Sequence, residues 1–313
     1  MSPRSLSTAD WGTLVMLSVL WGFSFIFAKV ALHELPVFLF VALRVVLAGI
    51  TLVCLLKFGG AQLSVPRAAR TAVIFMGILN CVIPFCLFVW SQKYISAGLA
   101  SILNATTPLI AIVLAHFTTQ DEKITRCRLL GTAIGIGGVI VVVGAAALKG
   151  AKSDALAQMA CIVGAFSYAL AGVYGRRLEN MGVSPMSAAT GQVVASAFFL
   201  VPLSIVIDRP WELALPSLAT WGAIAGAAVL STALAYILYF RLLATAGATN
   251  MLLVALLVPI SAIILGAVLL DERLQTRQYV GALIVVAGLA VVDGRLPSYM
   301  AKRSMLIAGS TQR

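Results

Sequence analysis

The sequence predicts an all-α membrane protein with ten transmembrane helices, arranged as two five-helix repeats of inverted topology. First, hydrophobic residues make up 61% of the 313 residues and charged residues only 11%, whereas soluble domains carry about 25% charge. Second, ten apolar runs have the length of a membrane span. Third, two stretches of 11 residues resemble each other, "DEKITRCRLLG" at Asp121–Gly131 and "DERLQTRQYVG" at Asp271–Gly281. We call this pair the doubled phrase. Composition and runs predict the fold class, and the doubled phrase predicts the repeat.

The apolar runs set the number of spans. A bilayer core about 30 Å thick is crossed by about 20 residues of helix. The candidate spans are 11–31, 37–57, 71–91, 97–118, 127–148, 157–177, 185–207, 218–240, 249–270 and 277–293. Fourteen of the 22 Lys and Arg residues fall on the side of the two termini, which predicts that both termini are cytoplasmic. When both termini lie on the same side of the membrane, the number of spans must be even, and ten spans satisfy this condition.

The doubled phrase divides the chain into residues 11–148, residues 157–293 and a cytoplasmic tail, 294–313. Gly77 matches Gly226, and Pro108 and Pro259 precede the two acidic pairs at similar distances. Because five spans are an odd number, the second repeat enters the membrane from the opposite side. Inverted repeats are typical of secondary transporters, which open one site alternately to each side. The phrases themselves are predicted to be short, solvated turns before the last helix of each half.

Several stretches resemble a known family. "WGFSFIFAKVAL" in the first span is similar to the WG-x-x-F signature of EamA-type members of the drug/metabolite transporter superfamily, and "LRVVLAG" and "LLDERLQTRQYVGALIVVAG" fit the same pattern. The resemblance covers about residues 11–293. It implies ten helices, two inverted repeats and efflux or exchange of small metabolites, without fixing the substrate.

Polar and aromatic residues inside the first and third spans are candidates for a substrate cavity near the membrane midplane. Trp21 and Phe25 lie four residues apart and share one helix face, with Lys29 one turn further on. This pattern fits an aromatic wall or ordinary helix packing. Asn80, Pro84 and Phe88 have the same spacing. Pro84 removes a backbone hydrogen bond, so the third span is expected to be interrupted for binding, gating or structure alone.

The later spans add further cavity candidates. "LNATTP" places Asn104 and Thr107 beside a proline in the fourth span. The sixth span contributes Ser167 and Tyr168, and the eighth contributes Thr232 and Tyr236. A tyrosine suits a cavity wall because its apolar ring carries one hydrogen-bonding tip.

Arg44 is the charge that lies well inside a span, and it has two interpretations. It can bind a substrate carboxylate, or it can pair internally with backbone carbonyls. Gln192 holds the corresponding place in the second half, so the repeat does not reproduce the charge.

Several expected motifs are missing from the sequence. No Asp or Glu lies in the interior of a span, although Asp293 ends the tenth. No carboxylate is therefore present there for exchange of protons against cationic drugs, and a neutral, zwitterionic or anionic substrate is favoured. The chain lacks GxxxxGK[ST], HExxH and CxxC, so we expect no ATP hydrolysis, catalytic residues, cofactor or metal. An intramembrane enzyme, the competing class, would need clustered titratable groups.

The sequence is therefore best interpreted as an inner-membrane exporter of small metabolites, such as amino acids or related compounds. An exporter of drugs or organic cations is the alternative. The expected partners are a small-molecule substrate and the lipid bilayer, with no nucleic acid. The GxxxG steps Gly131–Gly135 and Gly222–Gly226 predict close packing between helices or subunits, so a homodimer is left open.

Overall fold

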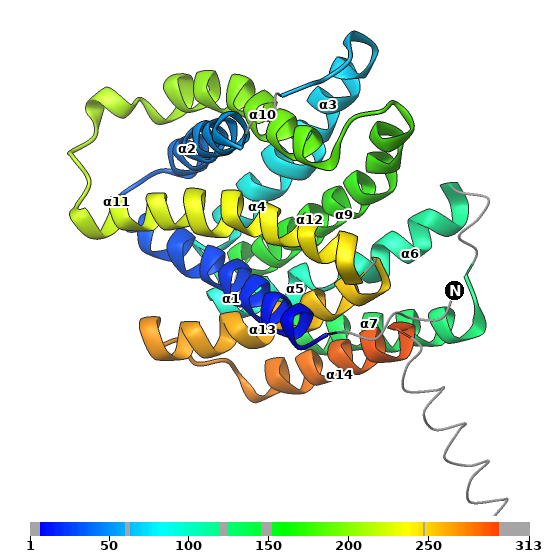
Figure 1. Cartoon of the computed structure of the whole chain (residues 1–313). Helices are drawn as coiled ribbons and strands as arrows, with labels where there is room; N and C mark the ends of the chain where they lie inside the picture. The colour runs from blue at the N-terminus through cyan, green and yellow to red at the C-terminus, as the bar shows by residue number, and fades with distance from the viewer. Residues whose placement is uncertain (1–6, 60–62, 119–123, 145–151, 247, 294–313) are drawn as a thin grey trace, which may run out of the picture.

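The computed structural model describes residues 7–59, 63–118, 124–144, 152–246 and 248–293, and in these ranges its regular elements are all helices (Figure 1). The first half contains α1 (Thr8–Ala31), α2 (Val37–Phe58), α3 (Arg70–Gly77), α4 (Ile83–Ser91), α5 (Ala97–Asn104), α6 (Thr107–Thr118) and α7 (Arg126–Val143). The second half contains α9 (Lys152–Asn180), α10 (Pro185–Asp208), α11 (Leu218–Ala225), α12 (Ala235–Ala246), α13 (Ala248–Leu270) and α14 (Thr276–Asp293). Short 3-10 turns, Arg67–Ala69 and Pro210–Glu212, precede α3 and follow α10.

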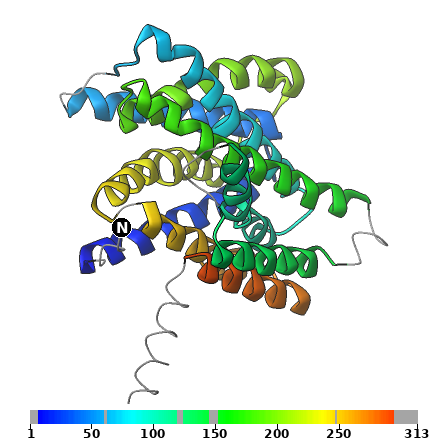
Figure 2. The same cartoon turned by 90° about the vertical axis from the view of Figure 1, so that its right-hand side faces the viewer.

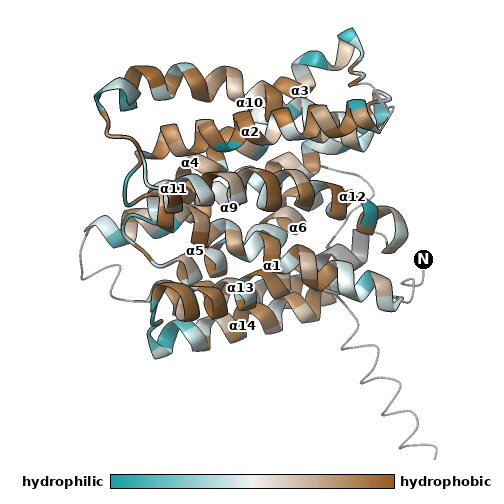
Figure 3. Ribbon diagram, turned by 60° about the vertical axis from the view of Figure 1, so that its left-hand side comes forward, coloured by the Kyte–Doolittle hydropathy of each residue, from teal (hydrophilic) through white to brown (hydrophobic). Residues whose placement is uncertain are grey.

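The helices are apolar on their outer faces as well as inside. Eight described segments are long and apolar enough to cross a membrane, and Cys127–Val143 and Thr276–Val292 are shorter apolar helices. These ten segments correspond to the ten predicted runs, while the number of crossings stays a prediction. Phe198 and Val268 are 76% and 73% exposed, and hydrophilic residues gather at helix ends and turns (Figure 3). Such a surface is suited to lipid, so the chain is a multi-pass membrane protein.

Hydroxyl side chains begin five of the helices. In each, the oxygen of the N-cap residue accepts a hydrogen bond from a backbone N–H in the first turn, which would otherwise have no partner. These N-caps are Ser7, Ser96, Thr125, Ser184 and Ser217. The capped ends fix where α1, α5, α7, α10 and α11 start.

Helices α7 and α14 form the most extensive helix pair and lie side by side in two views (Figures 1 and 2). Their backbones touch through glycines: a Cβ at Gly288 would lie 2.5 Å from the nitrogen of Gly135, and one at Gly131 would lie 2.6 Å from the oxygen of Gly288. The close packing predicted at Gly131 is therefore confirmed. In the other GxxxG step, a Cβ at Gly226 would meet the ring of Phe27, whereas a Cβ at Gly222 would have no atom within 4 Å.

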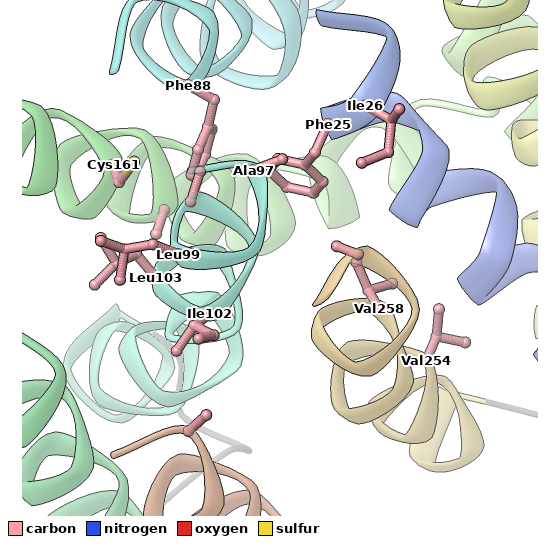
Figure 4. Packing of buried hydrophobic residues seen from close by; sticks show 14 of the residues in the cluster. Phe25, Ile26, Phe88, Ala97, Leu99, Ile102, Leu103, Cys161, Val254 and Val258 are labelled. Atoms are coloured by element: carbon pink, nitrogen blue, oxygen red, sulfur yellow. The ribbon is translucent and has the colours of Figure 1, made fainter. Parts of the chain in front are cut away.

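The remaining helices pack in a pattern that crosses between the two halves. Helix α2 packs on α10, α1 on α13, and α9 on α4 and α6. The largest buried cluster joins α1, α4, α5, α9 and α13. In Figure 4, Phe25 of α1 and Phe88 of α4 lie near Ala97 and Leu99 of α5. The core thus lies between the halves rather than inside each.

The acidic start of the doubled phrase is described only in its second copy, because Asp121–Lys123 of the first copy lie outside the described residues. Asp271 is exposed with a φ of 51°, as expected of a solvated turn. Glu272 differs. Its Oε1 accepts from the N–H of Ala97 at 2.8 Å and its Oε2 from the N–H of Gly98 at 3.2 Å. The carboxylate therefore caps the start of α5, 175 residues away in sequence.

Candidate functional site

The third span of each half departs from α-helical geometry in its middle. Residues Ile78–Val82 form a π-helical segment between α3 and α4, and Gly226–Leu234 form one between α11 and α12. In the first, the N–H of Ile83 donates to the oxygen of Ile78, five residues earlier. Pro84 follows at once and has no N–H to donate, which explains the predicted interruption. Segments of this kind are frequent at functional sites.

Side-chain hydroxyls satisfy carbonyls within and beside these segments. Ser167 of α9 donates to the oxygen of Leu79 at 2.7 Å, and Thr232 donates to the oxygen of Ala227 at 2.8 Å. Ser231 donates to the oxygen of Leu20, on α1, at 2.6 Å. The bonds at Leu79 and Ala227 place a hydroxyl donor on carbonyls within the segments, where the α-helical pattern of backbone bonds is interrupted.

Two further hydrogen bonds, between side chains, connect the segments to the second helix of the opposite half. The Nε of Arg44, on α2, donates to Oγ1 of Thr232 at 3.0 Å, and the Nδ2 of Asn80 donates to Oε1 of Gln192, on α10, at 3.1 Å. Arg44 and Gln192 hold corresponding places in the two halves, and Thr232 and Asn80 both lie in the π-helical segments. The pattern is reciprocal: the second helix of each half contacts the third helix of the other.

Arg44 lies in a neutral, partly aromatic environment. The side chain is only 6% exposed, and its guanidinium carbon lies 4.1 Å from the centre of the Phe85 ring. Its electrostatic neighbours are Tyr168, Tyr236 and Cys81. Tyr236 also lies beside the amide pair, with its hydroxyl oxygen 3.5 Å from Nδ2 of Asn80. The two hydrogen-bonded pairs thus belong to one polar cluster, which we call the Arg44 cluster: Arg44, Asn80, Gln192, Thr232 and Tyr236.

An aromatic run extends from this cluster across the core. The ring of Phe88 stacks on Tyr168 at a centroid distance of 6.0 Å and meets Phe25 edge-on at 6.2 Å. Trp21 lies 5.8 Å from the ring of Tyr239. Phe88 therefore meets Tyr168 beside the Arg44 cluster, and Phe25 is connected to it through Phe88, whereas Trp21 packs on Tyr239.

Other predicted candidates lie apart. Asn104 ends α5 and Thr107 begins α6, and the hydroxyl of Thr107 donates to the backbone oxygen of Asn104 at 2.7 Å. These two residues form a local turn, with no hydrogen bond to the Arg44 cluster in the described structure. Lys29 donates to the oxygens of Gln92 and Ile95 at 2.6 and 3.1 Å, so its cation is already engaged.

Two surface hollows lie elsewhere. One is an apolar groove between α2 and α10, and the other is bordered by Lys93 and Asp208. Within the described ranges, no group of three His, Cys, Asp or Glu residues could hold a metal ion.

Sequence reasoning missed three contacts at these sites. Gln192 is predicted as the counterpart of Arg44 but is not among the candidates, and Phe85 is not named by the sequence analysis. Glu272 was assigned to a solvated turn. The signal that could have indicated Gln192 is the repeat, because Gln192 holds the place in the second half that Arg44, a candidate, holds in the first.

Comparisons with known proteins agree with the helical architecture. The model of the EamA-like transporter family matches residues 11–144 and 155–292. A protein of Escherichia coli (strain K12), named a probable amino-acid metabolite efflux pump, is 26% identical over 91% of this chain and 95% of its own. The uncharacterized transporter YoaV of Bacillus subtilis is 22% identical over 88% and 94%. A crystal structure with 18% identity superposes with a TM-score of 0.66 over 91% of this chain and 98% of the other, which supports the fold.

Proposed function

Because the chain belongs to the EamA-like transporter family, we propose that it is a secondary transporter that exports small metabolites, amino acids or related compounds, by alternating access. The Escherichia coli relative's name supports this substrate class. An enzymatic role has no support in the family match. A second relative, named the inner membrane transporter YedA, supports placement in an inner membrane.

The proposal includes ten spans in two inverted five-helix repeats with cytoplasmic termini. The family model matches twice, once in each half. Equivalent helices pair with one another, α2 with α10 and α7 with α14, and α1–α13 contacts are mirrored by α9–α6 contacts. A two-fold relation between halves would produce these pairs, and an odd number of spans in each half would make that relation an inverted one.

The reciprocal bonds Arg44–Thr232 and Asn80–Gln192 carry the functional proposal. In transporters built from inverted repeats, the site lies where the repeats meet and where helices are interrupted. Both bonds join the halves at π-helical segments. We therefore propose that the Arg44 cluster, with Phe25, Phe88, Ser167 and Tyr168 beside it, lines the substrate path. Trp21, Pro84, Asn104 and Thr107 are proposed as its more distant parts.

Transport by the purified protein in liposomes tests the proposal. Vesicles are loaded with radiolabelled amino acids in one set and with cationic dyes in the other, and release is followed against protein-free vesicles. We expect protein-dependent release of at least one amino acid. Release of dyes alone would establish the drug-exporter alternative, and no release of any solute would overturn the proposed function.

Topology has its own test. In a background without native cysteines, a cysteine at Ser153, in the first turn of α9, is expected to react with an impermeant maleimide added outside intact cells. Reaction only after the cells are opened would place this end in the cytoplasm and overturn the ten-span topology with cytoplasmic termini.

A further inference from the structure

Arg44 carries a buried positive charge whose hydrogen-bonding capacity is mostly unused. A guanidinium has five N–H donors, and the described structure uses one, from Nε to the hydroxyl of Thr232. Pairing with backbone carbonyls, the internal role expected for this residue, is not what the structure shows. Its other close contact is the face of Phe85. The Nη atoms make no hydrogen bond in the described structure, so their N–H groups remain available to donate to a ligand.

The charge of Arg44 has no described anion beside it. Its electrostatic neighbours, Tyr168, Tyr236 and Cys81, are neutral hydroxyl and thiol groups. An aromatic face stabilises a cation only in part, and an ionised group removed from water and left unpaired is strongly unfavourable. An anion bound at Arg44 would offset this cost, so the site is poised for a negatively charged group.

We infer that Arg44 binds the carboxylate of the transported solute, and that the site therefore selects small carboxylic acids, including zwitterionic amino acids, over amines. The inference rests on the proposed transport function and names its substrate class. A carboxylate presents two oxygens in a plane, which matches the guanidinium fork. The Nη donors on the side not used by Thr232 supply this fork.

The neighbouring amides supply a second point of recognition. In the Asn80–Gln192 pair, Nδ2 of Asn80 donates to Oε1 of Gln192, which leaves Oδ1 of Asn80 and Nε2 of Gln192 for a ligand. Oδ1 accepts the hydrogen bond of an ammonium or hydroxyl group. An amine without a carboxylate would meet the fixed charge of Arg44 with no compensating acid, so like-charge repulsion disfavours organic cations.

A transported acid and two analogues of it test this inference. Wild-type protein in liposomes is screened for uptake of the standard amino acids and of short monocarboxylates. The best-transported acid is then compared with its carboxamide and with its decarboxylated amine. We expect the acid to half-saturate transport at a concentration at least about 10-fold lower than either analogue, the factor expected for a hydrogen bond to a charged group.

Substitution of Arg44 tests whether this residue causes the preference for the acid. Arg44→Gln is expected to raise the half-saturating concentration of the acid by about 10- to 100-fold and to change that of the carboxamide much less. Arg44→Lys keeps the charge without the fork and should lie between. Arg209→Gln is the matched control, because Arg209 is exposed and pairs with Glu212 at a helix end. It should change neither value.

The outcomes separate the two proposals. Transport of no acid, analogue or dye by wild-type protein overturns the proposed function. Transport in which acid, amide and amine are equivalent, or in which Arg44→Gln keeps the acid preference, overturns only the carboxylate assignment. If Arg44→Gln does not fold, thermal unfolding of the wild type decides: the acid must raise Tm more than the carboxamide does, and equal shifts refute the assignment.

Discussion

The carboxylate of Glu272 is expected to hold the two halves together at one end of the molecule. It accepts from the N–H groups of Ala97 and Gly98 at 2.8 and 3.2 Å, at the positive end of α5. Glu272 lies in the turn between α13 and α14, while α5 belongs to the first half. Glu272→Gln keeps the size of the side chain but removes its charge and turns one acceptor oxygen into a donor.

The cost of this substitution follows from the two bonds. One backbone N–H loses its acceptor, at about 1.5–3 kcal/mol for a bond to a charged group. The loss of charge at a helix N-terminus adds about 0.3–1 kcal/mol. Because Glu272 is only partly buried, we expect a total of about 1–3 kcal/mol, which corresponds to about a 5- to 150-fold shift toward an arrangement open at this end.

Cysteine labelling measures the opening. In a background without native cysteines, a cysteine replaces Leu274, which packs within 3.6 Å of where a Cβ at Gly98 would lie. Glu272→Gln should speed its reaction with a maleimide and lower Tm in detergent. Asp271→Asn is the matched control, because the adjacent acid is exposed and asparagine tolerates its positive φ. Equal labelling and Tm in the two variants would refute the reasoning.

Three further predictions address other parts of the chain. Gly288→Ala places a Cβ 2.5 Å from a backbone nitrogen of α7 and should destabilise the protein by about 1–3 kcal/mol. Gly137→Ala, whose Cβ would meet nothing within 4 Å, should leave Tm unchanged, and equal Tm losses would contradict backbone contact. Trp21→Ala and Asn104→Ala should slow transport without loss of folded, inserted protein; unchanged rates would remove these residues from the substrate path. The carboxylate of Glu34 accepts a backbone N–H of α11's cap, which lowers its pKa below the ordinary 4.5. Its stabilisation is therefore present at neutral pH and declines as pH falls below that value, so the Tm difference between wild type and Glu34→Gln should shrink at pH 4, and a constant difference would argue against it.

The sequence predicted those features that depend on local chemistry. Apolar runs of span length became helices, because backbone groups in lipid must bond within their own segment. A break not predicted from the sequence lies near Pro108, where α5 ends and α6 begins. The matching proline of the second half causes none, since α13 continues through Pro259. A proline removes one backbone hydrogen-bond donor. Whether the helix is interrupted at that point depends on how neighbouring helices pack against it.

Features that depend on distant contacts could not be predicted. Gly226–Leu234 contains no proline, and nothing local distinguishes its π-helical geometry from an ordinary helix. The role of Glu272 depends on a helix start 175 residues away. The Arg44 cluster was anticipated in part, because a polar residue inside a span requires a partner. Which residues became partners was decided by how the halves meet.

The π-helical segments also have a genetic consequence. Each turn of such a segment holds an extra residue relative to an α-helix, so loss of a single residue there can restore regular helix. Loss of one residue from an ordinary helix instead rotates everything beyond it by about 100° and moves the buried face outward. Codon deletions should therefore be tolerated far better within 78–82 and 226–234 than elsewhere in the same spans, at the expense of the contacts made by Asn80 and Thr232. The two segments mark where the lengths of these membrane helices can change during evolution.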